Sequence, residues 1–238
     1  MSSTAIVLKG LAESDLIVVH TAAGLRQASQ WIPTDRHIHL GWPAATVEEI
    51  RRRFAAAASV GDDTDEPYAL LIGRGNRYKG LGVLLEAVSS GLRLRIGGQL
   101  EEAGDAAWIG GYFPSVSWEP GCVDSRRLNE LIDRASVVVF PYLSGFDAHG
   151  GASGALVHAL TFGKTIVVSE ELRPQVPDLV SCLVVPTGDP MALRAALEQA
   201  MTNSDDFRQP TRELEDYLVE HHSYEGHVER LVERLRSL

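Results

Sequence analysis

From about residue 68 to residue 201, short apolar runs alternate with longer amphipathic stretches. Several runs are almost continuously apolar, which is typical of parallel strands covered by helices on both faces. In the stretches between them, apolar residues recur every three or four positions and so share one helical face. This alternation predicts an α/β domain with a doubly wound, parallel, Rossmann-like sheet. We expect the strand order 3-2-1-4-5-6, with a ligand above the strand ends where that order reverses.

The expected strands lie at 68–72, 92–96, 116–118, 137–140, 165–168 and 182–185. The apolar faces of the expected helices fall within 81–88, 128–132 and 193–200. Asp124 and Asp189 are start signals for the second and third helices, because a carboxylate can accept hydrogen bonds from the first free N–H groups of a helix.

The rest of the chain divides into shorter units. Residues 1–45 contain a strand at 16–19, a helix at 22–31 and a short strand at 38–40, which is too little for a core of their own. Residues 46–66 begin as a helix and end in a polar, flexible connection. We therefore expect an N-terminal remnant at 1–45, a linker at 46–66, the α/β domain at 67–206 and C-terminal helices at 207–238.

Charge and cysteine content narrow the possible partners. The chain has 22 Lys and Arg residues against 32 Asp and Glu, a formal net charge of −10. This charge argues against a protein that binds nucleic acid, whose affinity comes mainly from basic residues. We expect no transmembrane segment, because no apolar run approaches the roughly 20 residues that span a bilayer. The N-terminus lacks the pattern of a secretory signal, and Cys122 and Cys182 are too few for a disulfide framework or a metal cluster, so we expect a cytoplasmic location.

Residues 70–82 read Leu-Leu-Ile-Gly-Arg-Gly-Asn-Arg-Tyr-Lys-Gly-Leu-Gly, the most informative segment of the chain. A strand ending at Gly73 leads through a glycine-rich loop into a helix. Such a turn aims backbone N–H groups and the positive end of the helix dipole at one point. Glycines, here Gly73 and Gly75, let the backbone approach a ligand closely, and Arg74 and Lys79 add positive charge. The segment therefore predicts a diphosphate held at the edge of the sheet.

Other interpretations of this segment are weaker or remain open. Its spacing is neither that of a phosphate-binding loop in nucleoside triphosphatases nor that of a dinucleotide-binding fingerprint. Arg74 and Lys79 could instead be solvated loop charges. The sequence Asp63-Thr-Asp65 lies in the polar connection rather than at a strand end, so we interpret it as solvated and expect no metal site.

Five sequence blocks resemble, in order, the C-terminal domain of the family 4 retaining glycosyltransferases. These enzymes have the GT-B fold, in which an active site lies between two Rossmann-like domains. The matching blocks are residues 73–80, 94–98, 116–132, 135–142 and 159–168. By this resemblance, 67–206 is the nucleotide-sugar-binding domain, 1–45 is a remnant of the acceptor domain and 224–235 is a terminal crossover helix.

The resemblance implies transfer of a sugar from a nucleoside-diphosphate sugar to a hydroxyl acceptor, as in hexosyltransferases. The configuration of the sugar would be retained, and neither a metal nor another cofactor would be needed. Arg74 and Lys79 would hold the donor diphosphate as the catalytic groups, with Gly73 and Gly75 beside them. The backbone from Trp118 to Val123 would frame the nucleobase.

The chain departs from the family at a pair of glutamates eight positions apart. Alignment on Gly163 puts Gly150 and His158 at those positions. His158 could hydrogen-bond a ribose hydroxyl, or it could be an inter-helix histidine that faces no ligand. A subset of the family with a similar Pro-Tyr and Ser-Gly pattern implies that Ser153 caps a helix. The N–H groups of Ser153 and Gly154 would then face the phosphates.

The preceding loop carries Asp147 and His149, which could replace the missing carboxylate near the sugar or could simply be exposed polar side chains. Most of an acceptor domain has no counterpart in this sequence. Two functions therefore remain open: a transferase domain of a two-domain enzyme, or a binding or regulatory subunit that needs a partner chain carrying the acceptor domain. In either case, an uncovered interdomain face would favour a partner chain or self-association.

Overall fold

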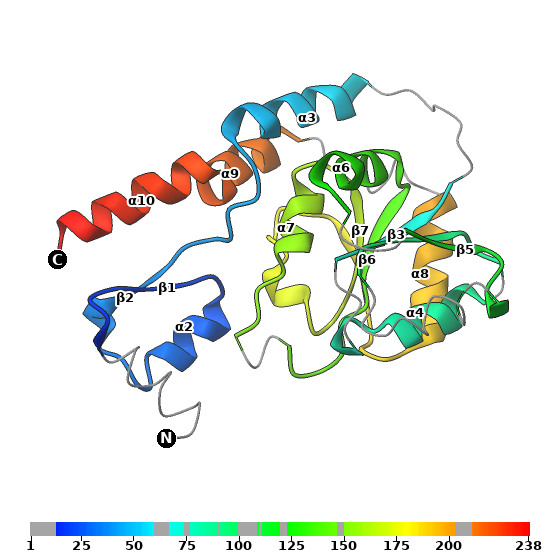
Figure 1. The fold of residues 1–238 in the computed structure, drawn as a ribbon, viewed down its shortest axis with the longest axis horizontal. Helices are drawn as coiled ribbons and strands as arrows, with labels where there is room; N and C mark the ends of the chain where they lie inside the picture. Colours follow the sequence, from blue (N-terminus) through cyan, green and yellow to red (C-terminus); the bar gives the residue numbers. More distant parts are fainter. Residues whose placement is uncertain are drawn as a thin grey trace.

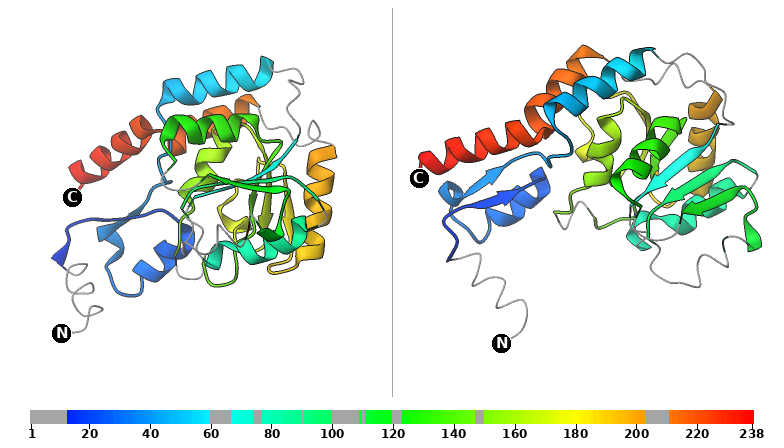
Figure 2. Two further views of the ribbon diagram at one scale, coloured as in Figure 1. Left: turned by 45° about the vertical axis from the view of Figure 1, so that its right-hand side comes forward. Right: turned by 45° about the horizontal axis from the view of Figure 1, so that its top comes forward.

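The computed structural model (Figures 1 and 2) describes residues 13–59, 67–73, 77–89, 91–99, 109, 111–119, 123–146, 150–202 and 211–238. The strands are β1 (Ile17–Val19), β2 (His37–His39), β3 (Ala69–Ile72), β4 (Leu94–Gly97), β5 (Val116–Glu119), β6 (Val137–Phe140), β7 (Thr165–Ser169) and β8 (Cys182–Val185). The α-helices are α2 (Ala22–Ala28), α3 (Val47–Ser59), α4 (Leu81–Val88), α6 (Ser125–Arg134), α7 (Gly154–Leu160), α8 (Pro190–Thr202), α9 (Arg212–His222) and α10 (Tyr224–Arg236). Short 3₁₀ helices lie at η1 (Thr34–Arg36), η2 (Arg77–Lys79) and η3 (Arg173–Gln175).

The main sheet has six strands in the order β5-β4-β3-β6-β7-β8, and every neighbouring pair is parallel. Counted within the domain, this is the expected order 3-2-1-4-5-6, so the doubly wound prediction is confirmed. The order reverses between β3 and β6, which end at Ile72 and Phe140. All residues of these two strands are buried, as their continuous apolar sequences indicated.

Helices cover both faces of this sheet because alternate strand residues point to opposite sides. Leu71 and Val139 pack into one apolar cluster with α4 and α8, whereas Leu70 and Phe140 pack into the other. That second cluster includes residues of α3, α6, α7 and α9, although the sequence analysis placed α3 in the linker. Figure 1 shows α4 and α8 together on one side of the sheet and α6 and α7 on the other.

A separate two-stranded unit precedes the domain. β1 and β2 pair in parallel, and α2 packs beside them. The helix ends at Ala28, earlier than expected, and the hydroxyl of Ser29 donates to the carbonyl of Leu25 at 2.8 Å. A serine that bonds back to the preceding turn competes with helix continuation.

The C-terminal helix α10 runs out from the domain alongside this unit (Figures 1 and 2). The ring of His227 lies within hydrogen-bond distance of the Gly41 carbonyl, 3.2 Å, and Arg234 donates to the carbonyl of Asp35. The helix therefore crosses back onto the N-terminal unit, although none of its side chains is buried. Among the described residues, no helix is both long and apolar enough to cross a membrane.

Candidate functional site

A pocket of about 480 Å³ opens at the carboxyl end of β3, where the sheet order reverses. This volume is in the range of small-molecule binding sites. The pocket is lined by the end of β3, the first residues of α6 and α7, the segment between β2 and α3, and polar side chains of α3. The lining residues are Trp42, Pro43, Ala44, Glu49, Arg53, Ile72, Gly73, Ser125, Leu128, Asn129, Gly154, Ala155, His158 and Tyr224. Three predicted site residues, Gly73, Gly154 and His158, are among them.

Lys79 places a positive charge beside this pocket. Its side chain is buried, and its Nζ lies 5.7 Å from the centroid of the Tyr142 ring. A Cβ added to Gly73 would come within 2.6 Å of that Nζ and 4.0 Å of the Cβ of Ala155. The ammonium group therefore lies where the end of β3 meets the start of α7. Gly73 also has φ +101°, so a side chain at this position would be strained as well as crowded.

The turn that carries Lys79 is fixed by close packing against the end of β6. Gly80 precedes α4 in the left-handed conformation, with φ +72°. A Cβ at this position would lie 1.9 Å from the carbonyl oxygen of Pro141, which is backbone and cannot move aside. The helix expected after the glycine-rich loop therefore begins directly after Gly80. Arg74, Gly75, Asp147 and His149 lie outside the described residues.

Ser153 caps α7, as predicted. Its Oγ accepts a hydrogen bond from the N–H of Leu156 at 3.3 Å and lies 3.0 Å from the hydroxyl of Tyr142. The backbone N–H of Ser153, however, donates to Oε1 of Gln175 at 3.0 Å, so it is already used within the protein. Of the two N–H groups expected to face the phosphates, that of Gly154 remains the candidate.

Gln175 and Tyr142 hold the segment that leads into α7, and the sequence analysis assigned neither residue a role. Nε2 of Gln175 donates to the carbonyl of Gly151 at 2.7 Å, so one amide side chain clamps both ends of this short segment. Burial raises the pKa of Tyr142 to about 12, which keeps its hydroxyl neutral beside Ser153. Tyr142 thus contacts both Lys79 and the cap of α7.

His158 lines the pocket, but its ring nitrogens have partners within the protein. Nε2 lies 2.9 Å from Oδ1 of Asn129 on α6, and a backbone hydrogen bond links the ring to Ala44. Burial, with a smaller effect of the Arg53 charge, lowers the pKa of His158 to about 4. The neutral ring has a single N–H to donate, and the ring already faces protein groups on two sides. This geometry supports the interpretation of His158 as an inter-helix histidine.

Arg53, a buried cation on the same side of the pocket, is also held in place. It donates to the hydroxyl of Thr161 at 2.7 Å and lies 4.3 Å from the centroid of the Phe162 ring. Its nearby carboxylate, Glu49, accepts from both the N–H and the hydroxyl of Thr46, an arrangement that caps α3. These contacts give Arg53 and Glu49 structural roles.

Gly150 occupies the other position where the family has a glutamate. Its φ of +72° is left-handed, and a Cβ added there would lie 3.0 Å from the Cα of Gly24. The hydroxyl of Thr21 donates to the Gly150 carbonyl at 3.4 Å. This position is therefore part of the contact between the domain and the N-terminal unit, and a glutamate would be strained there.

The predicted base-framing segment, Trp118 to Val123, is anchored at both ends. The indole N–H of Trp118 donates to the carbonyl of Gly98 at 2.8 Å, and Val123 packs against the core. Residues 120–122 between them lie outside the described residues.

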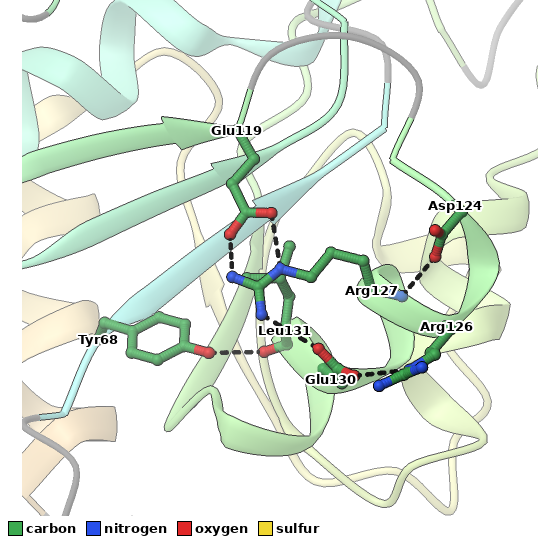
Figure 3. A network of polar contacts seen from close by, with 7 residues as sticks. All are labelled: Tyr68, Glu119, Asp124, Arg126, Arg127, Glu130 and Leu131. Carbon is green, nitrogen blue, oxygen red and sulfur yellow. Dashed lines mark hydrogen bonds and ion pairs between the residues drawn. The ribbon is translucent and has the colours of Figure 1, made fainter.

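A network of charged side chains joins β5 to α6 (Figure 3). Both carboxylate oxygens of Glu119 accept from the guanidinium of Arg127, one of them at 2.8 Å, and Glu130 accepts from the same group at 3.1 Å. The Arg127 hydrogen bond lowers the pKa of Glu119. Asp124 accepts from the backbone N–H of Arg127 at 2.7 Å, which confirms its predicted role as the cap of α6. The network fixes the entry to α6, whose first turn lines the pocket.

Comparison with known proteins assigns the domain to a family. The family model described as "Glycosyl transferases group 1" matches residues 66–203, more than half of the chain. The chain belongs to this family. The comparison with curated proteins found no match.

This chain with a group 1 glycosyltransferase domain also shares its fold with solved structures of low sequence identity. Sucrose-phosphate synthase from Thermosynechococcus elongatus is 17% identical, with a TM-score of 0.75 over 98% of this chain and 60% of that one. Anabaena HepE, solved with UDP-glucose, is 13% identical, with a TM-score of 0.72 over 100% of this chain and 69% of that one. A UDP-forming α,α-trehalose-phosphate synthase from Burkholderia xenovorans is 15% identical, with a TM-score of 0.71 over 97% of this chain and 63% of that one. These matches confirm the fold as that of the C-terminal half of GT-B glycosyltransferases, and the chain spans about two thirds or less of each matched protein.

Proposed function

We propose that the chain is the donor-binding part of a retaining glycosyltransferase and that its pocket holds a nucleoside-diphosphate sugar. The observation that carries the proposal is the Lys79 ammonium group beside Gly73, at the point where the sheet order reverses. Parallel α/β sheets bind ligands at this point. The buried cation suits the diphosphate, and the neighbouring pocket is large enough for the rest of a small ligand.

In this proposal the chain acts mainly by electrostatic stabilisation of the leaving group. The bond between the anomeric carbon of the sugar and the diphosphate oxygen breaks, and the oxygen keeps the electron pair. Lys79, together with Arg74 as the family resemblance implies, stabilises the negative charge that develops. A hydroxyl acceptor forms the new bond to the same face of the sugar and releases its proton.

We propose a uridine diphosphate hexose as the donor. HepE, which shares the fold, was solved with UDP-glucose, and the matched trehalose-phosphate synthase is described as UDP-forming. Trp118 and Val123 are the two ends of the segment that would frame the uracil.

Calorimetric titration tests this proposal. The chain is titrated with UDP, GDP and ADP, and then the Lys79→Ala, Arg74→Ala and Lys164→Ala variants are titrated with the diphosphate that binds most tightly. Removal of a charged hydrogen-bond donor to phosphate is expected to weaken binding about tenfold or more. Lys164 is the matched control, because it contacts the carbonyl of Asp133 rather than the pocket. Absence of binding to all three diphosphates at millimolar concentration would contradict the proposal.

A second candidate function is a binding or regulatory subunit that needs a partner chain with an acceptor domain. It is favoured by Gly150 and His158, which the fold uses for packing where the family has glutamates. Exposed apolar side chains on one face of α10 provide a surface for a partner chain or a second copy. They are Tyr224, Val228, Val232 and Leu235.

Turnover by the isolated chain tests the second candidate. The isolated chain is incubated with UDP-glucose and a panel of hydroxyl acceptors, and the release of UDP is measured. UDP release by this chain alone contradicts the subunit, whereas donor binding without UDP release fits both a subunit and a transferase domain that needs its acceptor half.

A further inference from the structure

Trp42 closes one side of the pocket, and it comes from outside the nucleotide-sugar-binding domain. It lies between β2 and α3 in the segment Gly41-Trp42-Pro43, and its side chain lines the pocket while remaining 42% exposed. A large aromatic side chain that stays accessible inside a pocket is a common feature of ligand contacts.

The position of Trp42 is fixed by the junction between α9 and α10. Its carbonyl lies 2.9 Å from Nδ1 of His222, and the N–H of Ala44, two residues on, donates to the carbonyl of His222 at 2.9 Å. The ring of His20 meets the indole edge to face, with centroids 4.7 Å apart. The indole is therefore held by both terminal units of the chain.

The indole packs directly on Gly154, the first residue of α7. A Cβ added to Gly154 would lie 2.9 Å from Nε1 of Trp42 and 3.3 Å from its Cδ1. Gly154 does not have a positive φ, so its backbone would accept alanine. The close approach of Trp42 thus explains why this position holds a glycine.

We propose that the indole N–H of Trp42 is a further hydrogen-bond donor to the diphosphate of the nucleotide sugar. This inference rests on the proposed function. Trp42 touches Gly154. A Cβ placed on Gly73 would lie 4.0 Å from the Cβ of the neighbouring Ala155 and 2.6 Å from the Nζ of Lys79, so the indole N–H and the ammonium group border the same end of the pocket. Among the described residues, the indole N–H has no hydrogen-bond acceptor. A donor of this kind suits an anionic ligand and would make a charge-assisted hydrogen bond to a phosphate oxygen.

The test compares a nucleotide with its nucleoside. Wild-type chain and the Trp42→Phe variant are titrated calorimetrically with UDP and with uridine, which lacks the phosphates. Phenylalanine keeps an aromatic ring but removes the N–H. We expect UDP to bind about tenfold more weakly to the variant, and uridine to bind as it does to the wild type. Trp31→Phe is the matched control, because Trp31 is 70% exposed and lies outside the pocket.

A second variant keeps the test independent of the change at Trp42 itself. Gly154→Ala leaves the indole intact but forces it away from α7, so it is expected to weaken UDP binding in the same direction. Unchanged UDP binding in Trp42→Phe, or an equal loss for UDP and uridine, overturns the role of Trp42 while leaving the proposed function in place. If the wild type binds no UDP, GDP or ADP, the proposed function fails and this inference fails with it.

Discussion

Substitution of Gly73 by alanine should weaken diphosphate binding strongly while lowering the stability of the fold only slightly. Gly73 ends β3 with φ +101°, and a Cβ there would come within 2.6 Å of the Nζ of Lys79. The atom that the added Cβ would meet, the Nζ of Lys79, is the end of a flexible side chain and does not belong to the backbone. We therefore expect the ammonium group to move aside while the fold remains intact.

The expected magnitudes follow from these two effects. A left-handed conformation costs an alanine roughly 1–2 kcal/mol. Loss of glycine flexibility in the unfolded chain offsets about 0.4–1 kcal/mol of this. The variant should therefore lose only about 1 kcal/mol of unfolding free energy. Displacement of a charged donor from the diphosphate costs about 1.5–3 kcal/mol, so UDP affinity should fall at least about tenfold.

The assay combines urea denaturation with calorimetric titration of UDP. The matched control is Gly82→Ala in α4, where an added Cβ meets no atom within 4 Å. Alanine is the better helix former, so this variant should gain about 0.5–1 kcal/mol and bind UDP unchanged. A Gly73→Ala chain that folds and binds UDP as tightly as the wild type would refute the placement of Lys79 at the phosphate site.

Three further predictions concern the fold. Burial holds the pKa of both His158 and His222 at about 4, below the ordinary 6.5, so the contribution of these two histidines to the unfolding free energy should be constant above pH 6.5. Between pH 6.5 and pH 4 only the unfolded chain binds a proton at each histidine. The unfolding free energy should therefore fall by about 1.4 kcal/mol per pH unit for each histidine as the pH is lowered. Equal urea midpoints at pH 7 and pH 5 would contradict this. Tyr68→Phe should cost about 1–3 kcal/mol in urea denaturation, because it leaves the buried carbonyl of Leu131 without its 2.8 Å donor, and an unchanged midpoint would count against that bond. Gly80→Ala should yield little folded protein by circular dichroism, since its Cβ would lie 1.9 Å from a backbone oxygen, and a native spectrum would show that the turn can relax.

Local sequence signals predicted much of the fold. Alternation of apolar runs with amphipathic stretches specified parallel strands between helices, and the order of the six strands followed from the doubly wound rule. Asp124 and Ser153 were predicted as caps, and both accept the expected backbone hydrogen bonds. These features depend on residues close together in the sequence, where composition and spacing are informative.

The parts of the site that depend on tertiary contacts could not be predicted in this way. Trp42 reaches Gly154 across more than a hundred residues, and Gln175 clamps the segment before α7 from a turn that follows β7. His158 was left open between a ribose contact and an inter-helix role, because only the position of Asn129 distinguishes them. An aromatic residue between Gly41 and Pro43 was the one sequence signal that could have marked Trp42 as a ligand contact.

The most direct measurement of the central claim is a crystal structure of the chain with a bound nucleoside diphosphate, with UDP as the first choice. We predict the diphosphate at the carboxyl end of β3, between Gly73 and Gly154, with a phosphate oxygen within hydrogen-bond distance of the Nζ of Lys79. A diphosphate bound elsewhere on the chain, or bound in this pocket without contact to Lys79, would contradict the account.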